Sequence, residues 1–131
     1  MNQLPYSTIG GQVTRGEAFA QLLDYLRLCA DCCQRMSTPH YLAEDYVALQ
    51  HNLTMAEEAA NVLGHLLATE DSQSDKLLSR GWLGIGEMLH NNRTTLQHLA
   101  ARPHINRWAK VRKMFEAIAW QVQKMHEAKR Q

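Results

Sequence analysis

Cysteine is scarce in this sequence and confined to one short stretch. The three cysteines, Cys29, Cys32 and Cys33, lie within five consecutive positions, whereas a disulfide framework needs pairs spread along the chain. No run of apolar residues approaches the roughly 18 that a membrane-spanning helix requires, and the first residues lack the basic cluster and apolar core of a secretory signal. We therefore expect a cytoplasmic protein that neither forms a disulfide framework nor enters a membrane.

Several catalytic motifs are missing as well. The chain has no serine-nucleophile motif, no glycine-rich phosphate loop after a strand and no zinc-protease motif. The stretch GWLGIG, residues 81–86, falls inside an apolar pattern of helical period and is not expected to bind phosphate. Its 131 residues, 45% hydrophobic and 21% charged, suit one globular domain. We predict a protein that is not an enzyme and has neither a cofactor nor a metal.

Helix signals are clear in the first half of the chain. Thr14 and Glu17 form a capping-box pattern at a helix start, and apolar residues then recur at helical spacing as far as Met36. A second apolar seam runs from Leu42 to Leu67 with alternating spacings of four and three residues. These patterns predict two long helices separated by a short break.

The second half repeats the pattern. Apolar residues at the same spacing predict helices over residues 78–99 and 108–125, and short connections between long helices favour antiparallel neighbours. The sequence therefore predicts an all-α fold, an antiparallel up-down bundle of about four long helices. We expect a single domain over residues 14–131, preceded by a flexible N-terminal arm over residues 1–13.

Two local features leave alternatives open. A second capping-box pattern, from Thr54 to Glu57, would break the second helix, although the unbroken apolar seam favours one long helix. Gly81, Gly84 and Gly86 each cost about 1 kcal/mol relative to alanine in a helix interior. Their clustering predicts either a close helix crossing or a local kink.

The cysteines lie on or beside the apolar face of the first helix. Cys29 and Cys33 fall in the middle of that face and Cys32 falls on its flank, positions that suit small buried hydrophobic residues. Reactive cysteine pairs usually lie at a helix N-terminus, where the helix dipole lowers the thiol pKa, whereas these cysteines lie several turns inside. We expect buried and chemically quiet thiols.

A thiol-dependent enzyme is one alternative. Glu17, Cys29 and Cys32 have the spacing of the glutamate and two cysteines of the alkylhydroperoxidase D family of helical thiol peroxidases, which the chain resembles over these 16 residues. The resemblance implies a redox pair formed by the two cysteines. The histidine of that family would come four positions after the second cysteine, where this chain has Met36.

Histidines and carboxylates raise a metal-dependent alternative. Glu87 and His90 have the Glu-x-x-His spacing of di-iron bundles, but such sites need two of these motifs and two further carboxylates. A heptad series on the second helix is too widely spaced to share one ion, at about 10.5 Å per seven residues: Glu44, His51, Glu58 and His65. We interpret this series as a polar stripe.

Positive charge is absent from a long stretch of the chain. No lysine or arginine lies between Arg35 and Lys76, which enclose seven acidic residues, whereas from Arg102 onward eight basic residues outnumber two acidic ones, a net charge of +6. The last helix is therefore expected either to pair with the acidic second helix, or to bind an acidic protein partner or nucleic acid. A pI near 7.8 is unlike that of a dedicated nucleic-acid binder, so we place nucleic acid behind a protein partner.

The second helix is apolar on two sides. Val47, Met55 and Val62 lie opposite its seam by helical angle, and a helix with two apolar sides is usually covered twice. Two-fold symmetric dimers are the commonest way to cover such a surface. The sequence therefore predicts a homodimer with these three residues in the interface.

The last helix carries a tryptophan out of register with its core face. Trp120 lies roughly 140° from the centre of that face at Phe115, and Lys113, Glu116 and Lys124 lie one or two turns away. An exposed tryptophan among polar residues is a favoured composition for a binding hot spot. We predict a small regulatory or adaptor protein that binds a partner protein through this surface.

Overall fold

The chain folds into four long α-helices. The computed structural model describes residues 14–38, 43–68, 73–101 and 105–130, and the predicted N-terminal arm over residues 1–13 lies outside them. The helices are α1 (Arg15–Met36), α2 (Ala43–Ala68), α3 (Gln73–Ala101) and α4 (Ile105–Arg130). The predicted all-α fold class is confirmed.

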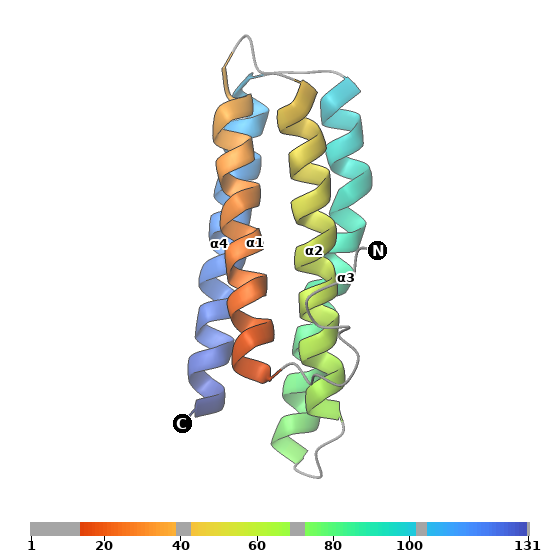
Figure 1. Ribbon diagram of the computed structural model, residues 1–131, viewed down its shortest axis with the longest axis vertical. Coiled ribbons are helices and arrows are strands. Elements are labelled where there is room, and N and C mark those ends of the chain that lie inside the picture. The colour runs from red at the N-terminus through yellow and green to blue at the C-terminus, as the bar shows by residue number, and fades with distance from the viewer. Residues whose placement is uncertain (1–13, 39–42, 69–72, 102–104, 131) are drawn as a thin grey trace.

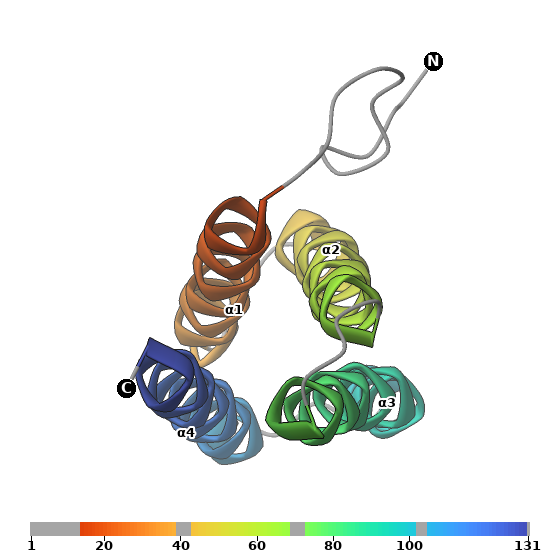
Figure 2. The same cartoon turned by 90° about the horizontal axis from the view of Figure 1, so that it is seen from below.

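The helices run alternately up and down (Figure 1). Seen from one end, they occupy four corners in the order α1, α2, α3, α4 (Figure 2). α1 packs against α2 and α4, and α2 packs against α3, whereas α3 and α4 contact each other only slightly. The predicted antiparallel up-down bundle is therefore confirmed, with its loosest seam between α3 and α4.

The start of α1 has the predicted capping box. The Thr14 hydroxyl oxygen accepts a hydrogen bond of 3.1 Å from the Glu17 backbone N–H, and the Glu17 carboxylate accepts one of 3.2 Å from the Thr14 backbone N–H. Both bonds satisfy amide groups that have no partner inside the helix. At the other end, the Ser37 hydroxyl donates to the Cys33 carbonyl over 2.8 Å, which fixes where α1 stops.

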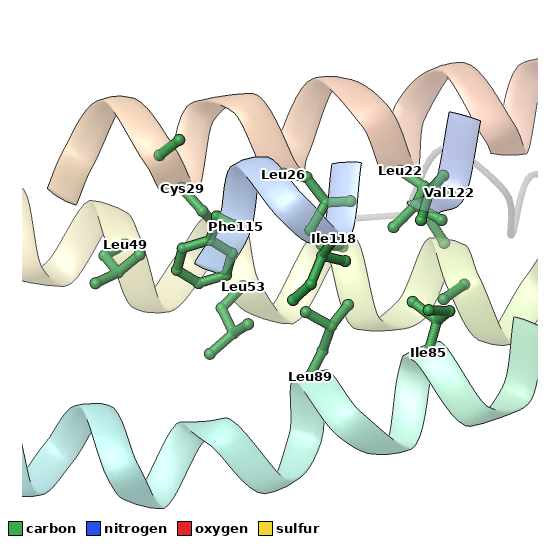
Figure 3. Close-up of a cluster of buried hydrophobic side chains, with 14 of the residues drawn as sticks. Leu22, Leu26, Cys29, Leu49, Leu53, Ile85, Leu89, Phe115, Ile118 and Val122 are labelled. Carbon is green, nitrogen blue, oxygen red and sulfur yellow. The ribbon is translucent and has the colours of Figure 1, made fainter. Parts of the chain in front are cut away.

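The core consists of the apolar seams read from the sequence. Each helix turns large side chains inward, and Figure 3 shows them meeting at the centre of the bundle. The buried residues labelled there are Leu22, Leu26, Cys29, Leu49, Leu53, Ile85, Leu89, Phe115, Ile118 and Val122. Because each helix is apolar mainly on this inner side, none of them, within the described residues, is both long and apolar enough to cross a membrane.

Glycines allow α2 and α3 to approach closely. A Cβ atom at Gly64 would lie 2.5 Å from Leu83 Cγ, and a Cβ atom at Gly86 would collide with the Asn61 side-chain oxygen. The Ser79 hydroxyl donates a hydrogen bond of 2.6 Å to the Gly64 carbonyl and links the two helices at the same level. Gly86 of the predicted cluster therefore allows a close approach of α3 to α2, whereas a Cβ atom at Gly84 would meet nothing within 4 Å. α3 is one continuous helix.

α2 is also a single helix, as the unbroken seam predicts. The Thr54 hydroxyl donates to the Gln50 carbonyl of the preceding turn over 3.0 Å and so does not cap a new helix. α2 and α4 occupy opposite corners and meet across the core through the rings of Tyr46 and Trp108, whose centroids lie 6.4 Å apart. No ion pair joins the two helices within the described residues. The expectation that the basic last helix pairs with the acidic second helix inside one chain is therefore wrong, because the order of the helices around the bundle places α1 and α3 between them.

Candidate functional site

α4 holds Trp120 on the outside of the bundle. Its side chain is 65% exposed, whereas Phe115 on the inner face is fully buried, as the angle between the two positions predicts. Lys113, Glu116 and Lys124 are exposed on the same outer face. The Lys124 ammonium lies 5.5 Å from the centroid of the Trp120 ring, within the range of a cation–π contact. The structure thus places the four predicted site residues on one surface.

Ion pairs on this face are local to α4. Glu116 lies 3.9 Å from Arg112, and Glu127 lies 3.6 Å from Lys124. Glu116, Lys124 and Glu127 are exposed and Arg112 is half-buried, so both pairs contribute little to stability. Lys113 forms no ion pair within the described part of the chain, so its ammonium is available to a partner. Glu116 and Glu127 are thus paired with basic residues of α4 itself, and the net charge that remains on this face is positive.

A hollow of about 280 Å³ lies beside this surface, between α1 and α4. Its floor is apolar, and the small side chains of Ala30 and Ala119 leave the space that larger residues would fill. Its rim carries charges of both signs from Arg27, Asp31 and Glu116. Glu116 of this rim lies one helical turn before Trp120, so the exposed indole lies beside the hollow on the outside of α4. This surface, together with Lys113 and Lys124, is called the α4 face below.

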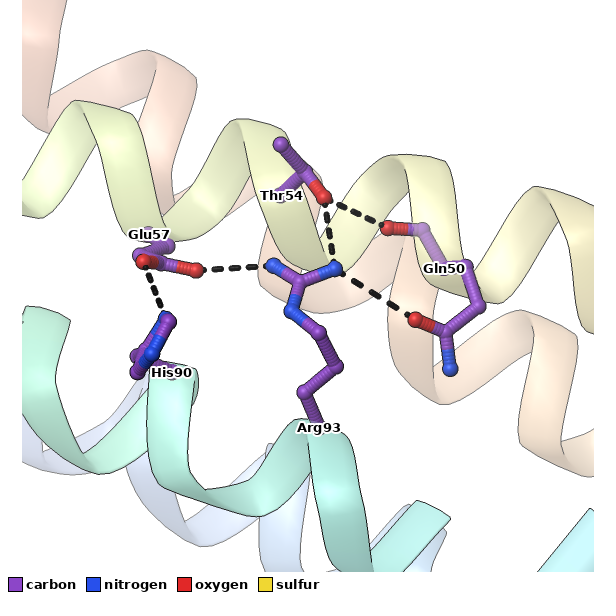
Figure 4. Close-up of polar contacts among 5 residues, drawn as sticks. All are labelled: Gln50, Thr54, Glu57, His90 and Arg93. Carbon is purple, nitrogen blue, oxygen red and sulfur yellow. Dashed lines mark hydrogen bonds and ion pairs between the residues drawn. The ribbon is translucent and has the colours of Figure 1, made fainter. Parts of the chain in front are cut away.

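A second polar cluster joins α2 to α3 (Figure 4). The Arg93 guanidinium donates to the Thr54 hydroxyl oxygen over 2.9 Å, to the Glu57 carboxylate over 2.8 Å and to the Gln50 side-chain oxygen over 3.4 Å. The other oxygen of Glu57 lies 2.9 Å from His90 Nδ1. The guanidinium and the carboxylate thus bind one another in a cross-helix network, which favours a role in holding α2 against α3.

The sequence contains a signal for this cluster. Gln50, Thr54 and Glu57 recur at spacings of four and three residues, so they form a polar stripe beside the apolar seam of α2. Arg93 also lies near Glu58, where burial raises the carboxyl pKa and the nearby guanidinium partly opposes that rise. Sequence reasoning missed Arg93 because only the fold brings it to these partners.

The Glu-x-x-His spacing on α3 does not build a metal site. Glu87 is exposed, and His90 lies beside Glu57 of α2. Among the residues that the structure describes, no three His, Cys, Asp or Glu side chains converge in a way that would hold an ion. The contact between His90 and Glu57 is therefore part of the polar α2–α3 cluster.

All three cysteines are buried. Burial raises the pKa of the Cys29 thiol well above its ordinary value and raises that of Cys33 to about 12. Burial also raises the pKa of Cys32, against the opposing effects of the Arg35 charge and a hydrogen bond from Asn52. Because the thiolate is the reactive form of cysteine, these surroundings favour inert thiols and lend no support to a redox pair.

The three residues predicted for a dimer interface differ in exposure. Val47 is 65% exposed and Val62 is half-buried, but Met55 is only 7% exposed. Met55 follows Asn52 by one helical turn, and the Asn52 amide contacts the Cys32 sulfur of α1. Met55 therefore lies on the α1 side of α2. The prediction that Met55 lies on the exposed outer face is wrong, because the chain buries a wider part of the α2 surface than the apolar seam alone.

Comparison with known proteins adds no relative. The chain matches no protein-family model, and neither a curated protein nor a solved structure is significantly similar to it. The functional argument therefore rests on the surfaces described above.

Proposed function

We propose that this protein is a small non-enzymatic regulatory or adaptor protein that binds a partner protein through the α4 face. The observation that carries the proposal is the 65% exposure of Trp120 beside a hollow with an apolar floor. Tryptophan supplies large contact area and a hydrogen-bond donor, and it is enriched among the residues that dominate binding energy. A partner side chain seated in the hollow would cover the indole at the same time.

Charge supports an acidic partner. Lys110 and Lys113 are exposed on α4, and the described acidic residues of that helix, Glu116 and Glu127, are engaged in local ion pairs. Complementary charge speeds association and makes it sensitive to salt. An acidic segment with one apolar side chain for the hollow is the partner that this surface fits best.

The test compares two variants with equally exposed apolar side chains. Partners captured from the native host by the wild-type protein are identified, and the purified partner is titrated against Trp120→Ala and Val47→Ala, since both wild-type side chains are 65% exposed on opposite corners of the bundle. We expect Trp120→Ala to weaken binding about 30-fold or more, the loss of a hot-spot residue, with an unchanged helical fold. Equal effects of the two variants would refute the assignment.

Charge reversal at Lys113 tests the same site independently. Lys113→Glu should slow association with the partner and reduce its dependence on salt, with a smaller effect on dissociation. Stopped-flow mixing at several salt concentrations measures both rates.

Nucleic acid is the second candidate. The exposed lysines flank an exposed indole, and single-stranded nucleic acids are bound by cationic surfaces on which bases stack on aromatic rings. Binding of arbitrary single-stranded DNA that weakens steeply with salt and is lost in Trp120→Ala would favour this candidate over a protein partner.

We also propose a homodimer through the outer side of α2, supported by the exposed Val47 and the half-buried Val62. A two-fold contact would place these residues against their counterparts in a second copy. Light scattering at tens of micromolar protein gives the mass directly, and a monomer would reject this interface.

A further inference from the structure

A pocket lies at one end of the bundle, away from the α4 face. It has a volume of about 390 Å³ and lies where the start of α1, the end of α2, the first part of α3 and the end of α4 meet, at the end that faces the viewer in Figure 2. Pockets between the helices of a bundle are common binding sites. Because a water-sized group takes up about 30 Å³, the space suits roughly a dozen non-hydrogen atoms.

The inner wall of the pocket is part of the apolar core. Leu63 and Leu67 of α2 and Trp82 of α3 line the pocket, and all three belong to the buried cluster that fills the bundle. The pocket therefore continues the core toward the end of the bundle. An apolar side chain placed there extends the core by removing further apolar surface from water, whereas a polar one loses its hydration and gains no partner from this wall.

The first turn of α1 forms another part of the lining. Thr14, Arg15 and Gly16 line the pocket, and the capping box holds Thr14 in an extended backbone conformation at the helix start. Residues 1–13 therefore join the chain at the edge of the pocket. A segment of this length reaches at most about 43 Å when extended, so it is long enough to turn back into the pocket.

The sequence of this segment matches the apolar wall. Residues 1–13, MNQLPYSTIGGQV, contain no Asp, Glu, Lys, Arg or His, and they include the large apolar side chains of Leu4, Tyr6 and Ile9. Two consecutive glycines separate Ile9 from Thr14, and such pairs are typical of turns. The Tyr6 and Ile9 side chains are the two nearest to the pocket along the chain, and together they have roughly the dozen non-hydrogen atoms that the space suits.

We propose that residues 1–13 dock into this pocket of their own chain, with Tyr6 and Ile9 against its apolar wall. Attachment at Thr14 makes the contact intramolecular, and a short tether raises the effective concentration of a segment at its site to the millimolar range. The docked segment closes this end of the bundle, so any other ligand of the pocket must displace it. The proposal is independent of the α4 face, which lies on the outside of α4 and around the hollow between α1 and α4.

Chymotrypsin cleavage after Tyr6 tests the docking in the full-length protein. A docked tyrosine is cleaved only when the segment leaves the pocket, so the rate follows the population of the undocked state. Ile9→Ser removes one anchor and keeps the cleavage site, and we expect it to speed cleavage after Tyr6 at least about 10-fold. Gln12→Ser, in the same segment, is the matched control and should leave the rate unchanged. The same changes in isolated peptides of residues 1–13 correct for altered intrinsic cleavage.

Two glycine substitutions test the pocket side of the contact. A Cβ atom at Gly16 would meet only the Thr14 hydroxyl oxygen, at 3.9 Å, and one at Gly84 would meet nothing within 4 Å, so Gly16→Met and Gly84→Met should both fold. Gly16 lines the pocket and Gly84 does not. Gly16→Met should therefore displace the segment and speed cleavage after Tyr6, whereas Gly84→Met should not.

NMR shows where the segment lies. The full-length protein should give an NOE between an Ile9 methyl group and the Trp82 indole that Ile9→Ser abolishes, and this variant should shift the Trp82 N–H signal but not that of Trp120. The same NOE between two differently labelled copies would place the segment in a second chain, which overturns the proposal. Cleavage after Tyr6 as fast in the wild-type protein as in Ile9→Ser would overturn it too, as would equal effects of Gly16→Met and Gly84→Met.

Discussion

Two glycine-to-alanine substitutions test the close packing of α2 on α3. Gly64 and Gly84 both lie inside long helices, so each substitution gains about 1 kcal/mol of helix propensity. Their surroundings differ sharply, because a Cβ atom at Gly84 would meet nothing within 4 Å, whereas one at Gly64 would lie 2.5 Å from two atoms of Leu83 and 3.2 Å from the Ser79 carbonyl oxygen. The pair therefore separates backbone propensity from packing.

Gly84→Ala and Gly64→Ala are expected to change the free energy of unfolding in opposite directions. Gly84→Ala should raise the free energy of unfolding by about 0.5–1 kcal/mol. At Gly64 the added methyl forces Leu83 and the Ser79 backbone to move, and overpacking of this kind costs about 1–3 kcal/mol. After the propensity gain is subtracted, Gly64→Ala should be roughly neutral to about 2 kcal/mol less stable, so the two variants should differ by about 1–3 kcal/mol.

Guanidinium chloride unfolding measures both values, provided that the slope of free energy against denaturant stays constant. The double variant Gly64→Ala with Leu83→Ala completes a mutant cycle. Because the shortened side chain at position 83 leaves room for the new methyl, the double variant should be more stable than the sum of the single changes predicts. If Gly64→Ala stabilises the protein as much as Gly84→Ala does, the close approach of the two helices is wrong.

The buried Cys33 thiol, the Arg93 network and the exposed Val47 give the remaining predictions. Burial raises the pKa of Cys33 from 9.0 to about 12, which should lower its thiolate fraction at pH 8 about 1,000-fold. A thiol reagent should therefore label Cys33 far more slowly in the native than in the unfolded protein. The pKa of Cys33 is higher in the folded than in the unfolded protein, so the stability that this thiol contributes below pH 9 should decline as the pH rises toward 12. The decline should reach up to about 1.4 kcal/mol per pH unit. Denaturant melts of Cys33→Ala should show a smaller decline. Arg93→Met should cost about 1–3 kcal/mol because Glu57 loses its main partner. His90→Ala, which removes an exposed polar contact, should cost less than about 1 kcal/mol in the same melts. Val47→Glu should shift a dimer to monomer in light scattering, and a dimer that survives this change must use another surface.

The sequence was sufficient to predict the helices and the core. Periodicity alone assigns a side chain to the inner or outer arc of its helix, and the buried positions Leu49, Leu53 and Leu89 and the exposed Trp120 follow that assignment. The capping box at Thr14 was predictable because all its atoms come from four consecutive residues. Features that depend on one helix were therefore read correctly.

Features that depend on contacts between two helices were not predicted correctly from the sequence. Helical angle gives the direction of a side chain but does not say which neighbour covers it, so Met55 was placed on the outer side of α2, although the chain buries it. The same limit hid the network around Arg93, whose partners lie 36 to 43 residues earlier in the chain. The hollow between α1 and α4 is lined by Ala30 of α1 and Ala119 of α4, and the local sequence around either residue does not show that the other lies nearby.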